Sequence, residues 1–213
     1  TNGLADYMKK TGSSEHLSSL NFSNFRLNVE RDLRLNANFF ISRREVEKVK
    51  KKFKLPDEYC VINTETKMTY APVKAWSKKK FSKVVMNTKE LNWIMVDKTK
   101  NFIKAENLIN LSGLISLREL IVIVSQSKLC LGTEGFLGHV ASAFSSVHSV
   151  VILSGFSTRE YVQHKNTKFI VANPKPICSP CWLTSKCEKK KQYCMTRITA
   201  KQVEEVVLNL SRI

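Results

Sequence analysis

The chain has 213 residues, of which 43% are hydrophobic, and this is enough for one α/β domain with a buried core, alone or with an extension. Seven glycines and five prolines exclude a collagen-like chain and a Pro/Gly-rich disordered tract. Lysine and arginine number 35 against 18 aspartates and glutamates, which gives a net charge of +17. A charge of this size attracts phosphates, anionic lipid or nucleic acid, so we expect an anionic partner.

The apolar residues are spread too evenly to form a membrane-spanning segment. No run approaches the roughly 18 consecutive apolar residues that a membrane span needs. The first residues, Thr1 to Gly3, do not resemble the charged-then-apolar start of a signal peptide. We therefore expect a cytosolic protein, and the start at Thr1 instead of Met suggests a processed or trimmed chain.

The first 41 residues differ in composition from the rest. Residues 1–41 are polar, rich in Asn and Ser, and carry only scattered apolar positions, which is typical of a connecting arm. We therefore predict a linker over 1–41 and one domain over 42–213. The first helix of that domain is predicted over 43–53, because Ser42 and Glu45 form a capping box in front of an amphipathic stretch.

Strands and helices then alternate to the end of the chain. Apolar runs typical of strands, the third of them a strand or a turn, occur at 59–63, 93–96, 107–111, 128–131, 147–153 and 168–172. Apolar residues at helical spacing occur at 79–85, 117–127 and 137–144 and after Thr199. Two of these helices begin with capping boxes, Ser116 with Glu119 and Thr199 with Gln202. Repeated βα units with continuously apolar strands predict a doubly wound, Rossmann-like α/β fold with a parallel sheet.

The most informative stretch is GTEGFLGHVASAF, residues 132–144, because it follows a predicted strand directly and opens a helix. In a doubly wound sheet this is the carboxyl end of a strand, where ligands bind, and the backbone N–H groups near Gly135 favour a phosphate. Thr133 can donate a hydroxyl, Glu134 can accept from a sugar or ribose hydroxyl, and His139 lies in the first turns of the helix. The alternative is a turn without a ligand, with His139 as a satisfied core residue.

The six cysteines fall into two groups. Cys60 and Cys130 lie in apolar runs and are expected to be small core residues. The other four lie in a Cys-rich segment, residues 178–194, as Cys178, Cys181, Cys187 and Cys194. Four thiolates can close a tetrahedral structural site for zinc or iron. Only the first two have CxxC spacing, so reduced thiols and disulfides remain alternatives. A catalytic metal is not expected, because no His or carboxylate leaves an obvious open coordination position.

Lysines are concentrated in three runs, within residues 50–54, 78–83 and 189–191. Such runs can attract phosphorylated lipid acceptors or an anionic membrane leaflet. The alternative for any single run is an ordinary solvated face. The total charge favours some functional attraction to anions.

Four motifs occur in an order that carries a family resemblance. After the first strand, a Thr-containing loop is followed by Lys74, Ala75 and Trp76, which form a Lys-x-Trp motif. A G-x-x-S-L-x-E-L segment begins at Gly113, and a G-x-x-x-H-x-A-x-A turn and helix begins at Gly135. The fourth motif is the Cys-rich segment with the Val-bearing helix after it. Over residues 45–210 the chain thus resembles glycosyltransferase family 9, the bacterial heptosyltransferases.

This resemblance implies the GT-B architecture, two Rossmann-like domains facing across a cleft, with residues 42–213 as the C-terminal, donor-binding half. The family's acceptor contacts and catalytic base lie in the N-terminal domain, of which residues 1–41 would be the last piece. This chain alone is therefore expected to catalyse little or nothing. The implied reaction is an inverting, metal-independent transfer from a nucleoside-diphosphate sugar, with an ADP-heptose-like donor as the first expectation. The implied acceptor is lipopolysaccharide core, another bacterial surface glycan or a glycoprotein, reached in the cytoplasm at the inner face of the inner membrane.

The resemblance also implies roles for individual residues. Lys74 would supply a cation to the diphosphate, Thr64 and Thr66 would supply hydroxyls, and the Gly135 turn would supply backbone N–H groups. If the resemblance is set aside, the alternative for Lys74 is an ordinary solvated lysine among many. Trp76 is expected to be a core or interface anchor rather than a stacking surface for the ligand.

The chain departs from the family pattern at the glycine turn. Thr133-Glu134-Gly135 stands where many members have Asp-Ser/Thr-Gly, and His139 follows Gly135 by four positions instead of three. The donor base and sugar therefore stay open, as do the catalytic base, the acceptor and the oligomeric state. One alternative is a basic, metal-stapled nucleic-acid-binding module, which the βα alternation disfavours. Another is an inactive, family-like scaffold or sugar-nucleotide sensor.

Overall fold

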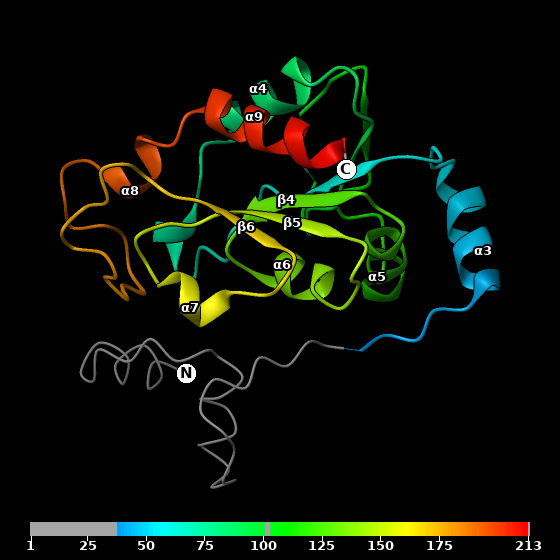
Figure 1. The fold of residues 1–213 in the computed structure, drawn as a ribbon, viewed down its shortest axis with the longest axis horizontal. Coiled ribbons are helices and arrows are strands. Elements are labelled where there is room, and N and C mark those ends of the chain that lie inside the picture. The colour runs from blue at the N-terminus through cyan, green and yellow to red at the C-terminus, as the bar shows by residue number, and fades with distance from the viewer. Residues whose placement is uncertain (1–37, 101–102, 213) are drawn as a thin grey trace, which may run out of the picture.

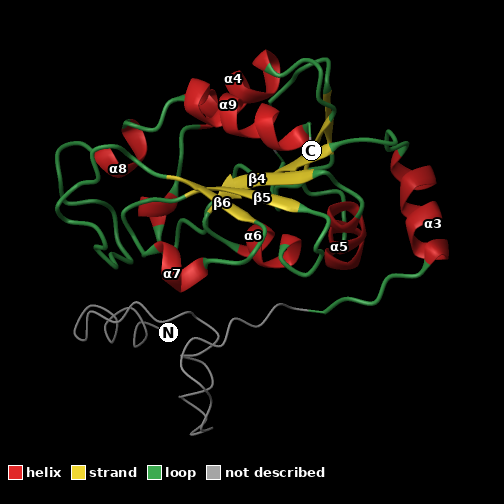
Figure 2. Cartoon of the chain, in the orientation of Figure 1, coloured by secondary structure: helices red, strands yellow, loops and turns green. Residues whose placement is uncertain are grey.

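The computed structural model describes residues 38–100 and 103–212, which form a six-stranded parallel sheet with helices on both faces (Figures 1 and 2). The strand order is β3-β2-β1-β4-β5-β6. The strands are β1 (Cys60–Ile62), β2 (Trp93–Met95), β3 (Leu108–Asn110), β4 (Leu129–Thr133), β5 (His148–Ile152) and β6 (Thr167–Ile170). This is the predicted doubly wound, Rossmann-like α/β fold, and its order reverses between β1 and β4.

The helices bury one apolar core on each face of the sheet. They are α3 (Arg43–Phe53), the 3₁₀ helix η1 (Pro72–Lys74), α4 (Lys78–Asn87), α5 (Leu117–Ser125), α6 (Phe136–Ala141), α7 (Arg159–Val162), α8 (Tyr193–Thr196) and α9 (Ala200–Ser211). Helices α4 and α9 pack together over one face, and α3, α5 and α6 line the core of the other (Figure 1). Strands β1, β2, β3 and β4 contribute apolar side chains to both cores, which explains their continuously apolar runs in the sequence.

The predicted helix starts are confirmed by three complete capping boxes. Ser42, Ser116 and Thr199 each accept a hydrogen bond from the backbone three residues later. The prediction of 137–144 as helix is too long, because α6 ends at Ala141. Helices η1, α7 and α8 were not predicted, since three or four residues are too few to show a helical period.

Two ion pairs join α3 and α5 through the capping residues themselves. Arg118 Nε lies 2.8 Å from Glu45 Oε1, and Lys52 Nζ lies 2.6 Å from Glu119 Oε1. Glu45 and Glu119 are the capping carboxylates of α3 and α5, so each caps its own helix and pairs with a cation of the other. The hydrogen bonds from Arg118 and Lys52, with those from the helix caps, lower the pKa of both carboxyls to about 2.

The residues expected to be core anchors are buried. Cys60 and Cys130 lie on opposite faces of the sheet, and burial raises the pKa of each thiol to about 12. Trp76 packs its ring edge-on against Phe81 at a centroid distance of 4.7 Å, and its Nε1 donates to the Ile198 carbonyl. Trp76 is thus a core anchor and not a stacking surface.

The domain boundary at residue 41 stays a prediction. Residues 1–37 of the predicted linker lie outside the described residues, and residues 38–42 lead into α3 without regular structure. Across the two described ranges, no helix combines the length and the apolar character that a membrane span requires.

Candidate functional site

The candidate site lies at the carboxyl edge of the sheet, where β1 and β4 run side by side and the chain leaves them in opposite directions. In doubly wound folds this point forms a crevice that holds ligands. Here Thr66, which follows β1, and Thr133, which ends β4, face each other with 3.1 Å between their hydroxyl oxygens. The structure therefore brings together two residues that lie 67 positions apart in the sequence.

Gly132 is what allows the two strand ends to approach so closely. A Cβ atom added at Gly132 would lie 3.2 Å from the Asn63 carbonyl oxygen, tighter than ordinary packing. At Gly135 an added Cβ would lie 3.8 Å from the Thr133 carbonyl oxygen, which is an ordinary van der Waals contact, so the fold tolerates a side chain there. The glycine that the packing requires is therefore the one inside the strand.

Next to the two threonines lies a buried ion pair. Lys74 Nζ, at the end of η1, is 2.8 Å from Glu134 Oε1, and Ser157 Oγ donates to Glu134 Oε2 at 2.7 Å. The side chains of Lys74 and Glu134 are only 14% and 3% exposed. The lysine ammonium also lies 4.1 Å from the centroid of the Phe156 ring. The sequence suggests separate roles for Lys74 and Glu134, and the structure places them in contact.

Aromatic rings surround this ion pair. Phe156 packs edge-on against Tyr70 and Trp182, with centroid distances of 6.4 and 5.4 Å, and Tyr161 packs on Trp182 at 5.1 Å. Burial raises the pKa of Tyr70 and Tyr161, and the negative charge of Glu134 raises it further. Both phenols therefore stay neutral beside the carboxylate. The rings fix the loop after β5 against η1 and hold the ion pair in a low-dielectric setting.

The polar groups of Thr64 are hydrogen-bonded to another residue of the protein, Asp97. Its backbone N–H and its hydroxyl each donate to the Asp97 carboxylate, both at 2.6 Å, and Asn63 Nδ2 donates to the same carboxylate at 3.1 Å. Asp97 follows β2 and is 1% exposed. Asp97 is not among the residues predicted for the site, although a carboxylate placed directly after an apolar strand run is a recognisable signal. It ties the loops after β1 and β2 together.

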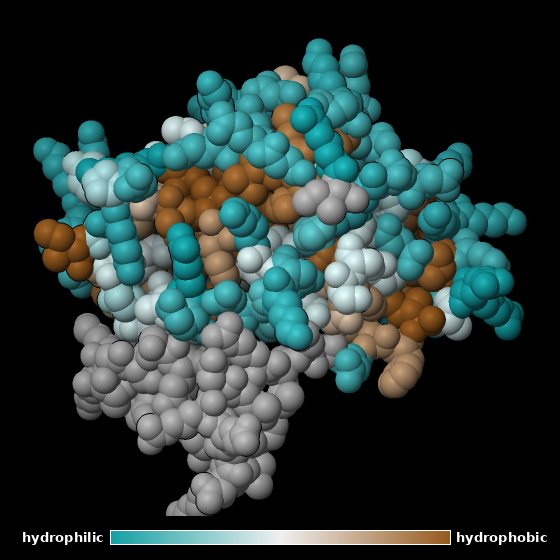
Figure 3. All heavy atoms as spheres, viewed as in Figure 1, coloured by the Kyte–Doolittle hydropathy of each residue, from teal (hydrophilic) through white to brown (hydrophobic). Residues whose placement is uncertain are grey.

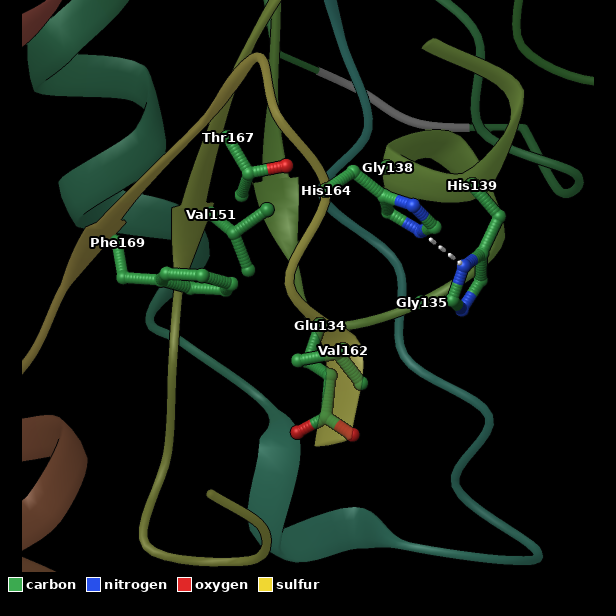
Figure 4. Close-up of a pocket in the computed structure, with 9 residues that line it drawn as sticks. All are labelled: Glu134, Gly135, Gly138, His139, Val151, Val162, His164, Thr167 and Phe169. Carbon is green, nitrogen blue, oxygen red and sulfur yellow. Dashed lines mark hydrogen bonds between the residues drawn. The ribbon is translucent and has the colours of Figure 1, made fainter. Parts of the chain in front are cut away.

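His139, on α6, faces a second histidine across a small pocket. Its Nδ1 lies 3.0 Å from Nε2 of His164, which precedes β6, and both line the pocket with Val151, Val162 and Phe169 (Figure 4). Figure 4 shows the two rings pointing toward each other, while the Glu134 carboxylate points away from them. His139 thus lies beside the glycine turn, as predicted, but on the far side of Glu134 from Lys74. His164 gave no signal in the sequence.

The Cys-rich segment lies against the loop after β5. The backbone N–H of Cys181 donates to the Gly155 carbonyl, and a Cβ at Gly155 would come within 3.2 Å of Cys194 Cβ. All four cysteines are free thiols. Burial raises the pKa of Cys181 and Cys194, and charge on the neighbouring cysteines raises it further. The thiols are therefore neighbours, but in the described part of the chain no three His, Cys, Asp or Glu side chains are arranged to hold a metal ion.

Neither a family model nor a curated protein matches this sequence. Solved structures do match its fold. ADP-heptose lipopolysaccharide heptosyltransferase II of E. coli superposes with a TM-score of 0.64 at 15% identity, covering 85% of this chain and 56% of that one. The family 9 glycosyltransferase of Veillonella parvula gives 0.67 at 12% identity, covering 94% and 61%.

A third match is TibC of enterotoxigenic E. coli, described as an iron-containing dodecameric glycosyltransferase, with a TM-score of 0.62 at 19% identity. It covers 88% of this chain and 53% of TibC, and TibC has also been solved with ADP-D-β-D-heptose. The chain thus spans a little over half the length of these proteins. It has the Rossmann-like fold found in family 9 glycosyltransferases of the heptosyltransferase type.

Proposed function

We propose that the chain is the donor-binding half of a glycosyltransferase that uses a nucleoside-diphosphate sugar. The observation that carries this function is the convergence of Thr66, Thr133, Lys74 and Glu134 at the carboxyl edge where β1 and β4 separate. Two hydroxyl donors and one ammonium at that position suit a diphosphate, and a carboxylate suits a sugar hydroxyl. An ADP-heptose-like donor is the first candidate, supported by the fold match to heptosyltransferase II and TibC.

The same residues suit an inverting transfer. When an acceptor hydroxyl attacks the anomeric carbon, the nucleoside diphosphate leaves and negative charge builds up on its phosphates. Lys74 and the hydroxyls of Thr66 and Thr133 would stabilise that charge without a metal ion, because they are fixed in place before the reaction. His139 would contact the donor from α6, on the other side of Glu134 from Lys74, and the Gly135 turn would supply backbone N–H groups.

The Lys74–Glu134 ion pair gives this proposal a defined binding step. A diphosphate can take the ammonium only by sharing it with Glu134 or by displacing that carboxylate. Glu134 would then turn toward a ribose or sugar hydroxyl while keeping the bond from Ser157. Binding of the complete donor is therefore expected to be stronger than binding of inorganic diphosphate, which offers Glu134 no hydroxyl.

The acceptor-binding half of the enzyme would correspond to the part of the solved glycosyltransferases that this chain does not cover. This chain covers only 56% of heptosyltransferase II and 53% of TibC, so acceptor contacts and the catalytic base belong to a second half in this proposal. We expect the acceptor to be lipopolysaccharide core, another surface glycan or a glycoprotein, and the reaction to take place in the cytoplasm. This chain alone would bind donor without transferring sugar.

Calorimetric titration with ADP, UDP, GDP and CDP at moderate salt tests donor binding. We expect saturable binding of one base over the others, lost in Lys74→Ala and kept in Lys79→Ala, which removes an exposed lysine of α4. The second variant is needed because a charge of +17 attracts any nucleotide weakly. Equal, unsaturable binding of all four by both variants would contradict a built donor site.

We also propose that Cys178, Cys181, Cys187 and Cys194 hold a structural zinc or iron ion. Four neighbouring free thiols support this, since thiolates suit both metals and would repel one another without a cation. Binding would require the segment to close around the ion, because the thiols are not gathered in a chelating geometry. Elemental analysis should give about one zinc or iron per chain. Protein purified without added metal that contains neither would reject the site.

A further inference from the structure

We propose that the segment 173–197, together with the start of α4, forms a docking surface for an anionic lipid bilayer. Between β6 and α9 the chain makes a long excursion whose only regular element is α8. This segment carries six exposed cations, Lys175, Lys186, Lys189, Lys190, Lys191 and Arg197. Glu188 is its one carboxylate. Among the described residues it is therefore a concentrated source of positive charge, and we call it the basic segment.

Hydrogen bonds attach the basic segment to α4 and η1. Gln192 Nε2 donates to the Val73 carbonyl, and Lys80 Nζ donates to the Thr196 carbonyl at 2.9 Å. Helix α4 has no acidic residue, and its Lys78 and Lys79 are exposed. The first turn of α4 therefore continues the same positive surface, although it lies about a hundred residues earlier in the chain.

Apolar side chains protrude from this positive surface. Ile177 is fully exposed and Tyr193 is 46% exposed, and both belong to the basic segment. Figure 3 shows hydrophobic atoms at the outer edge of the loop that precedes α8, next to hydrophilic ones. Basic residues around a protruding aliphatic side chain suit a bilayer surface, where the cations meet lipid phosphates and the apolar group enters the interface. Tyrosine is also favoured at that depth.

A lipid surface fits better than a nucleic acid. Proteins that bind single strands place exposed aromatic rings where bases can stack. Here the Tyr193 ring is occupied on one side by Arg197, whose guanidinium carbon lies 4.8 Å from the ring centroid. Ile177 offers no stacking surface and would only be exposed to water beside a phosphate backbone. In an acyl chain environment the same side chain is stabilised.

The docking surface borders the candidate donor site. Val73, which accepts from Gln192, is followed directly by Lys74, and both belong to η1. A chain docked through the basic segment would therefore hold the carboxyl edge of the sheet near the bilayer. This inference concerns a surface and does not depend on sugar transfer, so vesicle binding and nucleotide binding can fail separately.

Vesicle cosedimentation of the 213-residue chain tests the surface. The probes are phosphatidylcholine vesicles with and without phosphatidylglycerol, at low and high salt. We expect binding only with phosphatidylglycerol, weakened by salt. Replacing Lys189, Lys190 and Lys191 by Gln should weaken it about tenfold or more. The control replaces Arg44, Lys48 and Lys51, exposed on α3, by Gln, and should leave binding nearly unchanged although the net charge is identical.

A second pair of variants tests the apolar contact. Ile177→Ser should weaken binding about fivefold at a salt concentration where binding is still measurable. Leu114→Ser, at a position 60% exposed outside the basic segment, serves as the matched control and should have no effect. Equal losses in the two triple variants would reduce the effect to net charge and overturn the surface. Failure to bind phosphatidylglycerol, with binding of a single-stranded oligonucleotide that depends on Lys189 to Lys191, would assign the surface to nucleic acid instead.

Discussion

Lys74 and Glu134 form a buried ion pair, with Nζ 2.8 Å from Oε1, across 60 positions of sequence. The pair joins η1 to the end of β4 at the point where the candidate donor site lies. A lysine held by a buried carboxylate is fixed in position before any ligand arrives, which favours preorganised binding of a diphosphate. Because Lys74 makes this contact, both ligand binding and stability are expected to depend on Lys74.

Lys74→Ala should therefore lower stability as well as donor affinity. Removing the cation leaves the Glu134 carboxylate, 3% exposed, without its ionic partner, and we expect a cost of about 3 kcal/mol in the free energy of unfolding. Lys74→Met combined with Glu134→Gln should cost less than the sum of the single changes, because no unpaired charge remains. Urea unfolding of the wild type, Lys74→Ala, Lys74→Met, Glu134→Gln and the double variant measures this. A cost of Lys74→Ala below about 0.5 kcal/mol would show that solvent screens the pair.

Thr64 and Thr66 should separate stability from binding. Thr64→Val removes one of the donors to the buried Asp97 carboxylate and should cost about 1–3 kcal/mol. Thr66→Val removes a hydroxyl that faces Thr133 at the crevice, and should change stability less but weaken donor binding. Unfolding curves and nucleotide titrations on both variants check this. The opposite pattern, with Thr64→Val affecting only affinity, would place the Thr64 hydroxyl on the ligand.

His139 and His164 form a matched pair for testing a direct contact with the donor. His139→Ala should weaken nucleoside-diphosphate binding about tenfold, as expected for loss of one hydrogen bond to a charged phosphate. His164→Ala removes a ring that neighbours His139, and it should have a smaller effect on nucleotide binding. Titration of both folded variants decides this. Equal losses would mean that the histidine pair supports the local structure instead of contacting phosphate.

The contact between α3 and α5 should weaken in acid. The pKa of Glu119 falls from 4.5 to about 2 in the folded protein, so its ionised form stabilises the fold above pH 4.5 and this contribution is lost as the pH falls toward 2. Glu119→Gln keeps a capping side chain but loses the ion pair with Lys52. Thermal melts should show the wild type more stable at pH 7 and the difference shrinking below pH 4.5. Glu90→Gln, at an exposed position, should show no such trend, and a constant gap for Glu119→Gln would refute the ionic origin.

The sequence determined the local structure and the class of fold. Capping boxes at Ser42, Ser116 and Thr199 fixed three helix starts, because a cap depends only on residues within one turn. Continuously apolar strand runs identified a sheet covered on both faces. The motifs around Lys74 and Gly135 predict a donor site at the carboxyl edge of that sheet, which stays a prediction, and the matches to heptosyltransferase structures confirm the fold they implied.

Only the tertiary structure decided which polar groups meet. Glu134 is predicted to accept from a hydroxyl of the donor, and the structure shows that it also pairs with Lys74. The contacts of Asp97, Ser157 and His164 were not predicted. Such contacts join positions tens of residues apart, and their geometry depends on how the parallel strands align in register and where each loop turns. A sequence pattern records the chemistry of each residue, but the partner of a buried charge is set by packing across the sheet.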